Sequence, residues 1–367
     1  MNHYKLLTPG PLTTSETVKA QMLEDRCTWD DDYKNMTQEI RARLLALANL
    51  SPDAYTAILM QGSGSFVVES VLTSTIRDSD HALIISNGAY GERIAQMAER
   101  IGLSYTHYTT AYNTPPAINE LELLLQAEPH ITHIAMVHCE TTTGILNPIE
   151  AVAALAKKHE LTFIVDAMSS FGGVPIDVSG LDIDYVISSA NKCIQGVPGF
   201  GFVIAKKSLL LQTAGVSRSV SLDLYEQWKA MDVDGKWRFT SPTHVVAAFL
   251  QALRELEQEG GVEARYARYA SSNAYIREKL APLGFAAYID DALQSPIITA
   301  FLHPNDTFAF ADFYSYMKEH GFVLYPGKLT DVDTFRIGNI GEIYEQDVQT
   351  LCTTIENYMG VVANDKN

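Results

Sequence analysis

Two apolar runs that each end in polar residues decide the fold of this chain: 162-TFIVDAM-168 and 184-DYVISSANK-192. Such near-continuous hydrophobic runs are typical of strands in a parallel sheet whose two faces are both covered by helices. Similar runs occur at 55-YTAILMQ-61, 81-HALIISN-87, 105-YTHYTT-110, 133-HIAMVHC-139 and 200-FGFVIAKK-207. Helical patterns lie between them, at residues 65–76, 92–101, 118–126 and 148–159. This alternation predicts an α/β domain built on a mainly parallel sheet of seven strands flanked by helices.

The remainder of the chain has a different pattern. Residues 213–242 are polar and predict irregular structure, and a long helical pattern over 243–283 is interrupted by Gly260 and Gly261. Beyond it we expect a smaller α+β domain, with strands at 285–289, 295–302 and 334–339 and helices at 309–320 and 345–358. We therefore expect an N-terminal segment over residues 1–20, a large domain over 21–259 and a small domain over 260–367.

Composition and charge exclude several classes of protein. The 367 residues carry 27 basic and 44 acidic side chains, a formal charge of −17 that repels nucleic acid and anionic membrane surfaces. No apolar stretch approaches the length of a membrane span, and the N-terminus has no signal-peptide pattern. The four cysteines never form a CxxC motif, so we expect neither a disulfide scaffold nor a metal site. A cytoplasmic protein without nucleic-acid or membrane partners is expected.

A Gly/Ser turn, Ser63-Gly64-Ser65, follows the first predicted strand. Backbone N–H groups in such a turn, together with the N-terminus of the next helix, suit a phosphate group. The alternative is a tight turn with Ser65 as the helix N-cap. The nucleotide-binding pattern GxGxxG is not met because Val67 stands where its last glycine belongs, and GxxxxGK[ST] is absent, so a nucleotide site is disfavoured.

Three charged residues stand out, because ligands of open parallel sheets bind beyond the carboxyl ends of the strands. Asp166 ends one apolar run, and its alternative roles are a helix N-cap or a structural ion pair. Lys192 follows the next run, where an amine in apolar surroundings suits bonding to an aldehyde, although a surface lysine is the alternative. Arg336 lies in a predicted strand of the small domain and suits capture of a carboxylate or phosphonate, with an edge-strand salt bridge as the alternative.

Taken together, these features match the chemical needs of pyridoxal phosphate and an anionic substrate. Lys192 offers an amine to the aldehyde of this cofactor, Asp166 a carboxylate to its ring nitrogen, and the Ser63–Ser65 turn a cradle for its phosphate. Arg336 would then bind the anionic end of the substrate.

Motifs from all parts of the chain resemble the fold-type I, class V aminotransferases. They are 6-LLTPGPLTTS-15, 61-QGSGSFVVE-69, 86-SNGAYGERI-94, 138-HCETTTGILNP-148, 165-VDAMSSFGG-173, 188-SSANKCIQGVPGFGF-202, 239-FTSPTH-244 and 335-FRIGNIGE-342. The resemblance implies a pyridoxal phosphate-dependent fold with a large cofactor domain and a smaller C-terminal domain. It also implies a homodimer in which the two subunits share each active site.

The resemblance assigns a role to individual residues. Lys192 is the catalytic residue that bonds the cofactor, and the other cofactor-binding positions are Ser63, Gly64, Ser65, Tyr90, Thr143, Asp166 and Thr240. Ser65 departs from the threonine usual in the family but keeps a hydroxyl. Tyr90 would stack on the cofactor ring, Thr143 would lie close to it, and Thr240 would reach the phosphate from the neighbouring subunit. Arg336 would hold the substrate's anionic end, with Gly10 and Pro11 lining the same pocket.

The likeness is greatest to members that move the amino group of 2-aminoethylphosphonate to pyruvate in phosphonate catabolism, giving phosphonoacetaldehyde and L-alanine. Alanine–glyoxylate and serine–pyruvate aminotransferases of the same family remain alternatives. A cysteine desulfurase needs a mobile cysteine, whereas Cys352 lies in a helical pattern, and the default for Cys139 and Cys193 is packing. From other classes, a non-catalytic metabolite-binding module stays open, while a zinc hydrolase is weaker because His133, His138 and Cys139 have no closed ligand spacing.

Overall fold

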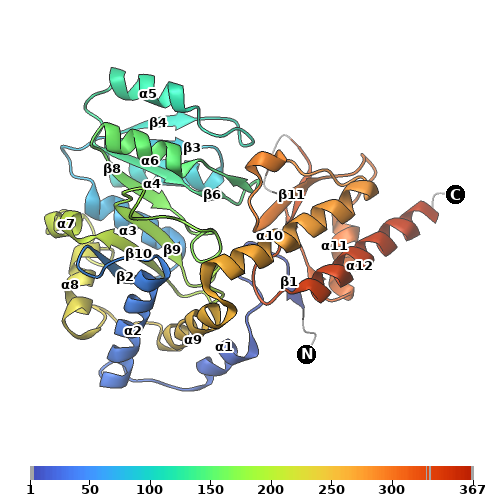
Figure 1. The fold of residues 1–367 in the computed structure, drawn as a ribbon, viewed down its shortest axis with the longest axis horizontal. Coiled ribbons are helices and arrows are strands. Elements are labelled where there is room, and N and C mark those ends of the chain that lie inside the picture. Colours follow the sequence, from blue (N-terminus) through green and yellow to red (C-terminus); the bar gives the residue numbers. More distant parts are fainter. Residues whose placement is uncertain (1–3, 328, 330–331, 365–367) are drawn as a thin grey trace.

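The computed structural model describes residues 4–327, 329 and 332–364. Figure 1 shows a larger part built on a central sheet and a smaller part beside it, with both chain ends at the smaller part. Among the described residues, no helix is long and apolar enough to cross a membrane. The cytoplasmic location stays a prediction.

Seven strands form the central sheet in the order β2-β10-β9-β8-β5-β3-β4. They are β2 (Tyr55–Gln61), β3 (Ala82–Ser86), β4 (Tyr105–Thr109), β5 (His133–Val137), β8 (Thr162–Asp166), β9 (Tyr185–Ser189) and β10 (Phe200–Lys206). Only β10 runs antiparallel to its neighbours, β2 and β9. The predicted mainly parallel sheet of seven strands is therefore confirmed.

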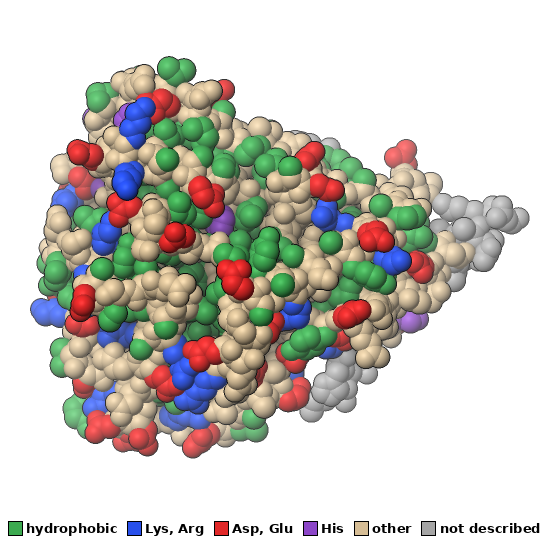
Figure 2. All heavy atoms as spheres, viewed as in Figure 1, with side chains coloured by type: hydrophobic (Ala, Val, Ile, Leu, Met, Phe, Trp, Pro, Cys, Tyr) green, Lys and Arg blue, Asp and Glu red, His purple; other side chains and the backbone are tan. Residues whose placement is uncertain are grey.

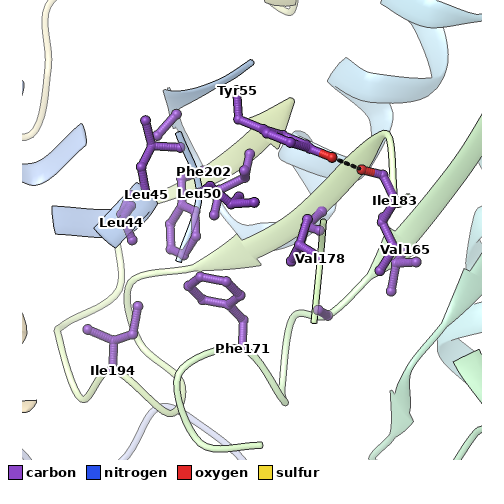
Figure 3. Packing of buried hydrophobic residues seen from close by; sticks show 14 of the residues in the cluster. Leu44, Leu45, Leu50, Tyr55, Val165, Phe171, Val178, Ile183, Ile194 and Phe202 are labelled. Atoms are coloured by element: carbon purple, nitrogen blue, oxygen red, sulfur yellow. Dashed lines mark hydrogen bonds between the residues drawn. The ribbon is translucent and has the colours of Figure 1, made fainter. Parts of the chain in front are cut away.

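Helices cover both faces of this sheet. They are α2 (Asp31–Leu47), α3 (Gly64–Thr75), α4 (Ala89–Ile101), α5 (Ile118–Ala127), α6 (Ile149–Lys158), α7 (Lys207–Leu210), α8 (Leu224–Asp234) and α9 (Thr243–Glu259). Side chains of β2 alternate between two cores: Ala57 and Leu59 belong to the core that includes side chains of α2, α5, α6 and α9, whereas Ile58 and Met60 belong to the core that includes those of α3 and α4. Figure 3 shows part of the first core, where Phe171, Phe202 and Leu44 meet. Burial on both faces explains why the inner strands are apolar along most of their length, whereas the edge strand β4 is partly exposed and more polar.

The prediction of irregular structure over 213–242 is wrong where α8 forms. Asp223 caps this helix by accepting from the N–H of Glu226, and Gly235 ends it in a left-handed conformation. Its buried side chains are Leu224, Gln227 and Met231. Because Gln227 is polar, it interrupts the apolar periodicity from which a helix is predicted. Helix α2 was not anticipated either.

The smaller part is built on a three-stranded antiparallel sheet in the order β11-β14-β13. Its elements are β11 (Ile298–Leu302), β12 (Phe322–Val323), β13 (Tyr325–Pro326), β14 (Thr334–Gly338), α10 (Gly261–Leu280), α11 (Phe310–Glu319) and α12 (Glu345–Asn364). The strand predicted at 285–289 is wrong, because this segment makes only a single bridge, Ala287 to Phe301. Helix α10 packs on both α9 and α12, so the boundary at residue 260 stays a prediction.

The N-terminal segment joins the smaller part. Its short strand β1 (Lys5–Leu6) pairs in parallel with β12, and the N–H of Gly338 in β14 donates to the carbonyl of Leu7. Helix α1 (Glu16–Ala20) then packs on α9. A small hairpin, β6 (Cys139–Glu140) with β7 (Ile145–Leu146), completes the strands. The residues between β1 and α1 are thereby held between the two parts.

A cluster of charges connects the two parts where α9 meets α10. Glu259 forms ion pairs with Arg265 at 2.6 Å and with Arg268 at 2.8 Å. Arg265 is buried and also donates to the carbonyl of Cys193, at 2.8 Å. Arg268 donates to the carbonyl of Ile343, also at 2.8 Å. One carboxylate therefore pairs with two guanidinium groups, and these hold backbone on either side.

We expect Glu259→Gln to lower the free energy of unfolding by about 3 kcal/mol, because it leaves two largely buried cations without their carboxylate. Glu257→Gln is the matched control, since Glu257 lies on the same helix and pairs with Arg43 at an exposed position. Its effect should stay below about 1 kcal/mol. Urea denaturation of both variants measures the difference, and equal losses would contradict this assignment.

Candidate active site

A cavity of about 560 Å³ opens at the carboxyl ends of the sheet strands. Its walls come from the turn between β2 and α3, from helix α4, from the loops after β8 and β9, and from the N-terminal segment. The residues lining it are Pro11, Gly62, Ser63, Gly64, Ser65, Val68, Tyr90, Arg93, Ile94, Met97, Asp166, Met168, Ser189, Asn191, Lys192, Pro198 and Gly199. Most of the residues assigned from sequence are thus brought together in one place.

Asp166 is the buried carboxylate of this cavity. Strand β8 ends at Asp166, and its Oδ1 accepts from the N–H of Met168 at 2.9 Å. Burial raises the pKa of Asp166 to about 7, and the negative charge of Glu140 adds to this effect, while Met168, Lys192 and Arg93 oppose it. Among the described residues, no cation forms an ion pair with Asp166. A cationic group entering the cavity would find an acceptor there.

Lys192 lies on the loop that follows β9. Its Nζ donates to the carbonyl of Pro9 at 2.8 Å, which ties the N-terminal segment to this lysine. Gly10 has a φ of +109° and approaches so closely that a Cβ there would lie 2.7 Å from the Cδ of Lys192. Glycine is therefore required at position 10 for both its conformation and its contact. Gly10 thus lies beside Lys192, and Pro11 lines the cavity, while their predicted place in the substrate pocket stays a prediction.

The Gly/Ser turn opens helix α3 into the cavity. The helix begins at Gly64, so the N-cap is Ser63 and the alternative that makes Ser65 the N-cap is wrong. The side chain of Ser63 makes no capping hydrogen bond to the helix. Gly64 and Ser65 occupy the first turn, where N–H groups have no partners within the helix and the helix dipole is positive. The turn therefore has the properties of an anion site.

Helix α4 presents Tyr90 to the cavity, and a second buried carboxylate holds the start of this helix. Glu140 accepts from the N–H of Tyr90 at 3.2 Å, from the N–H of Gly91 at 3.1 Å and from the hydroxyl of Thr142 at 2.7 Å. Burial raises the pKa of Glu140, while these hydrogen bonds oppose the rise. This role of Glu140 was not predicted; its only signal in the sequence is an acid directly after the apolar run over 133–139.

Arg336 lies outside the lining of the cavity. It is buried in β14, where Nε and Nη2 donate to the carbonyl of Pro326 at 3.0 and 2.9 Å and Nη1 donates to that of Thr141 at 2.9 Å. Burial lowers the pKa of Arg336, and Tyr90, Tyr325 and Glu140 lie near enough to oppose this. The edge-strand salt bridge is wrong, because β14 is the central strand and no carboxylate in the described ranges pairs with Arg336.

Besides Arg336, the predicted positions Gly10, Thr143 and Thr240 are not among the residues that line the cavity. Thr143 is buried, and its hydroxyl donates to the carbonyl of Tyr112 at 3.2 Å. Thr240 is exposed, so any contact with a cofactor would have to be made in another subunit. The predicted packing role of Cys139, Cys193 and Cys352 agrees with their burial, which raises the pKa of each thiol to about 12.

Asp166→Asn should stabilise protein prepared without cofactor, increasingly as the pH rises. The unfolded chain ionises this carboxyl near its ordinary pKa of 3.8, whereas the folded protein keeps the proton until about pH 7. As the pH rises from 3.8 to about 7, the wild type therefore loses on the order of 4 kcal/mol of stability relative to the variant. Above this range the difference in stability stays constant. Urea denaturation across this range measures it.

The control for this prediction is Asp53→Asn, which replaces an exposed aspartate of a surface turn. It should leave the pH dependence of stability unchanged. A variant Asp166→Asn whose stability follows that of the wild type at every pH would contradict the strong effect of burial on Asp166.

Comparison with known proteins gives both a family and a fold. Residues 19–331 match the family described as aminotransferase class-V. A 2-aminoethylphosphonate–pyruvate transaminase of Lysinibacillus sphaericus is 64% identical over 367 residues, which cover 100% of both chains. One from Bacillus cereus is 56% identical over 355 residues, covering 96% of this chain and 97% of its own. The structure of a pyridoxamine-pyruvate aminotransferase from Mesorhizobium loti superposes with a TM-score of 0.90 at 22% identity, covering 99% of this chain and 93% of that chain.

Proposed function

Because this chain belongs to the class-V aminotransferases, we propose that it moves the amino group of 2-aminoethylphosphonate to pyruvate, giving phosphonoacetaldehyde and L-alanine. Relatives that share 64% and 56% of its sequence over nearly their whole length are transaminases of this substrate pair. The observation that carries the proposal is the position of Asp166 and Lys192 on the wall of one cavity, directly after the paired strands β8 and β9.

The family generally uses pyridoxal phosphate, and the chemistry of the cavity fits this group. Asp166 is a buried acceptor with one N–H partner, and Lys192 supplies an amine on the same wall. Ser63, Gly64 and Ser65 would hold the phosphate, with Tyr90 and Thr143 beside the ring. When bound, the cofactor supplies an aldehyde and an electron-withdrawing ring that accepts the electron pair left behind by a departing proton.

Lys192 has two tasks in this proposal. Its Nζ would hold the cofactor, and its amine would be the general base that takes a proton from the carbon bearing the donor's amino group. The carbonyl of Pro9, 2.8 Å from Nζ, fixes the position of the amine. Asp166 would hold a proton at the ring nitrogen, because a buried carboxylate with one N–H partner is stabilised by a cationic neighbour.

Arg336 would bind the anionic ends of both substrates, the phosphonate of the donor and the carboxylate of pyruvate. Its three hydrogen bonds to carbonyl groups of Pro326 and Thr141 orient the guanidinium without neutralising it. A side chain that is oriented but keeps its positive charge is well prepared to bind an anion. Gly10 and Pro11, on the segment that contacts Lys192, would line the same pocket.

Donor preference tests this function. In cofactor-loaded protein, 2-aminoethylphosphonate should convert the cofactor from its aldehyde to its amine form much faster than serine or alanine does. The visible absorbance follows this conversion. Lys192→Ala should slow this conversion by about 100-fold or more, because it removes the general base. Stopped-flow absorbance measures both rates.

Two results would redirect the proposal. Preference for serine, with glyoxylate as acceptor, would favour the alanine–glyoxylate and serine–pyruvate type within the same family. If the protein shows no visible absorbance of bound cofactor even after pyridoxal phosphate is added, a non-catalytic metabolite-binding module would be favoured.

The exposed apolar residues beside the cavity support a homodimer. A groove of about 390 Å³ is lined by apolar side chains that include Phe66, Trp237 and Phe239, and Gly62 lines both this groove and the cavity. Phe66 and Phe239 are 53% and 50% exposed. Large exposed apolar side chains gathered in one place mark interaction surfaces. A second copy seated here would bring its Thr240, next to Phe239, toward the phosphate site of its partner.

Mixing two inactive variants tests this shared site. Lys192→Ala removes the base of one chain's own cavity, whereas Thr240→Asp would repel the phosphate in the partner's cavity. Random exchange of subunits should restore roughly a quarter of the wild-type activity, because half of the dimers then hold one intact site of two.

The matched control mixes Lys192→Ala with Asp166→Asn. Both changes lie in one chain's own cavity, so no mixed dimer gains an intact site and activity should stay low. A mixture of the Lys192 and Thr240 variants that stays equally inactive, or a protein that is monomeric by light scattering, would refute the shared active site.

A further inference from the structure

The cavity holds a cation, Arg93, that has no role in the function proposed above. Arg93 lies on α4 and lines the cavity together with Tyr90, Ile94 and Met97. These four residues follow the spacing of one helix face, so the face of α4 directed at the cavity carries one positive charge. The neighbouring helix α3 begins at the same cavity, with the turn that contains Ser65.

The contacts of Arg93 direct it toward that turn. Its Nη1 donates to the hydroxyl of Ser65 at 3.3 Å, and its Cζ lies 5.1 Å from the centre of the Tyr90 ring. In the part of the chain that the structure describes, no carboxylate forms an ion pair with Arg93. Arg336, in contrast, is fastened to the carbonyl groups of Pro326 and Thr141. The two arginines therefore occupy different surroundings.

We propose that Arg93 binds the phosphate group of the cofactor, together with the Ser63–Ser65 turn, and this inference rests on the proposed function. The turn offers N–H groups and hydroxyls, which carry only partial charges. A phosphate monoester carries up to two negative charges near neutral pH and is bound best by a guanidinium. Arg93 brings a full positive charge to this turn, because it lines the cavity and donates a hydrogen bond to Ser65.

Equilibrium binding to cofactor-free protein tests the role of Arg93 without any turnover. Titration with pyridoxal phosphate, followed by absorbance, should give a Kd that is 10- to 100-fold higher for Arg93→Gln than for wild type, since a charged hydrogen bond is lost (about 1.5–3 kcal/mol). Arg93→Lys keeps the charge and should lie between them. Pyridoxal, which lacks the phosphate, should bind Arg93→Gln and wild type equally.

The matched control is Arg100→Gln, which removes a positive charge from the last turn of the same helix at an exposed position. Its affinity for pyridoxal phosphate should equal that of wild type. Melting curves of the variants establish that each one is folded before its Kd is compared.

Two outcomes would overturn the inference. Equal weakening of pyridoxal and pyridoxal phosphate would mean that Arg93 only maintains the shape of the cavity. An unchanged Kd for pyridoxal phosphate, with a raised half-saturating concentration of 2-aminoethylphosphonate but not of L-alanine, would assign Arg93 to the phosphonate of the substrate instead. Failure of the proposed function is distinguishable, because the wild type would then show no donor-dependent conversion whatever the behaviour of Arg93.

Discussion

The site depends on one constraint, the parallel pairing of β8 with β9. Asp166 is in register with Ile187, and the N–H of Ala167 donates to the carbonyl of Ile187 at 3.0 Å. Both strands therefore end at the same edge of the sheet, and the chain leaves them side by side. The antiparallel strand β10 then holds the following loop, because the N–H of Ala190 donates to the carbonyl of Phe200. Without this strand order, Asp166 and Lys192 would not share a wall.

Two buried carboxylates stand near this edge, and their partners separate their roles. Glu140 is saturated by the N–H groups at the start of α4 and by a threonine hydroxyl, so it has little capacity left for a ligand. Asp166 has one N–H partner and faces the cavity. Glu140 thus acts through the helix that it fixes, which carries Tyr90 and Arg93. The next carbonyl along the chain, that of Thr141, accepts from Arg336, so one short loop connects both parts of the protein to the site.

Features that depend on local sequence patterns could be predicted, whereas features that depend on contacts between distant residues could not. All seven strands were predictable, six of them as apolar runs and the edge strand β4 from its tyrosine and threonine residues, and the strand ends then indicated Asp166 and Lys192. Helix α8 was missed because Gln227 interrupts its apolar face, and its amide donates to the carbonyl of Leu59 in a distant strand. The role of Arg93 could not be predicted, because a charged residue within a helical pattern indicates a solvent-facing position. Its direction depends on Ser65, a neighbour only in the folded chain.

The acidity of the chain raises a final question, because every proposed ligand is an anion. Figure 2 shows acidic side chains spread across the whole of one face, in contact with solvent. Charges in water are screened over about 8 Å at physiological ionic strength, so they contribute little inside a cavity. The potential there is set by the groups that line it, Lys192 and Arg93 with the start of α3, opposed by Asp166. Because burial holds the pKa of Asp166 near 7, this opposing charge is itself reduced until a cationic group pairs with it. Anion binding and an overall charge of −17 are therefore compatible, since they are determined by different residues.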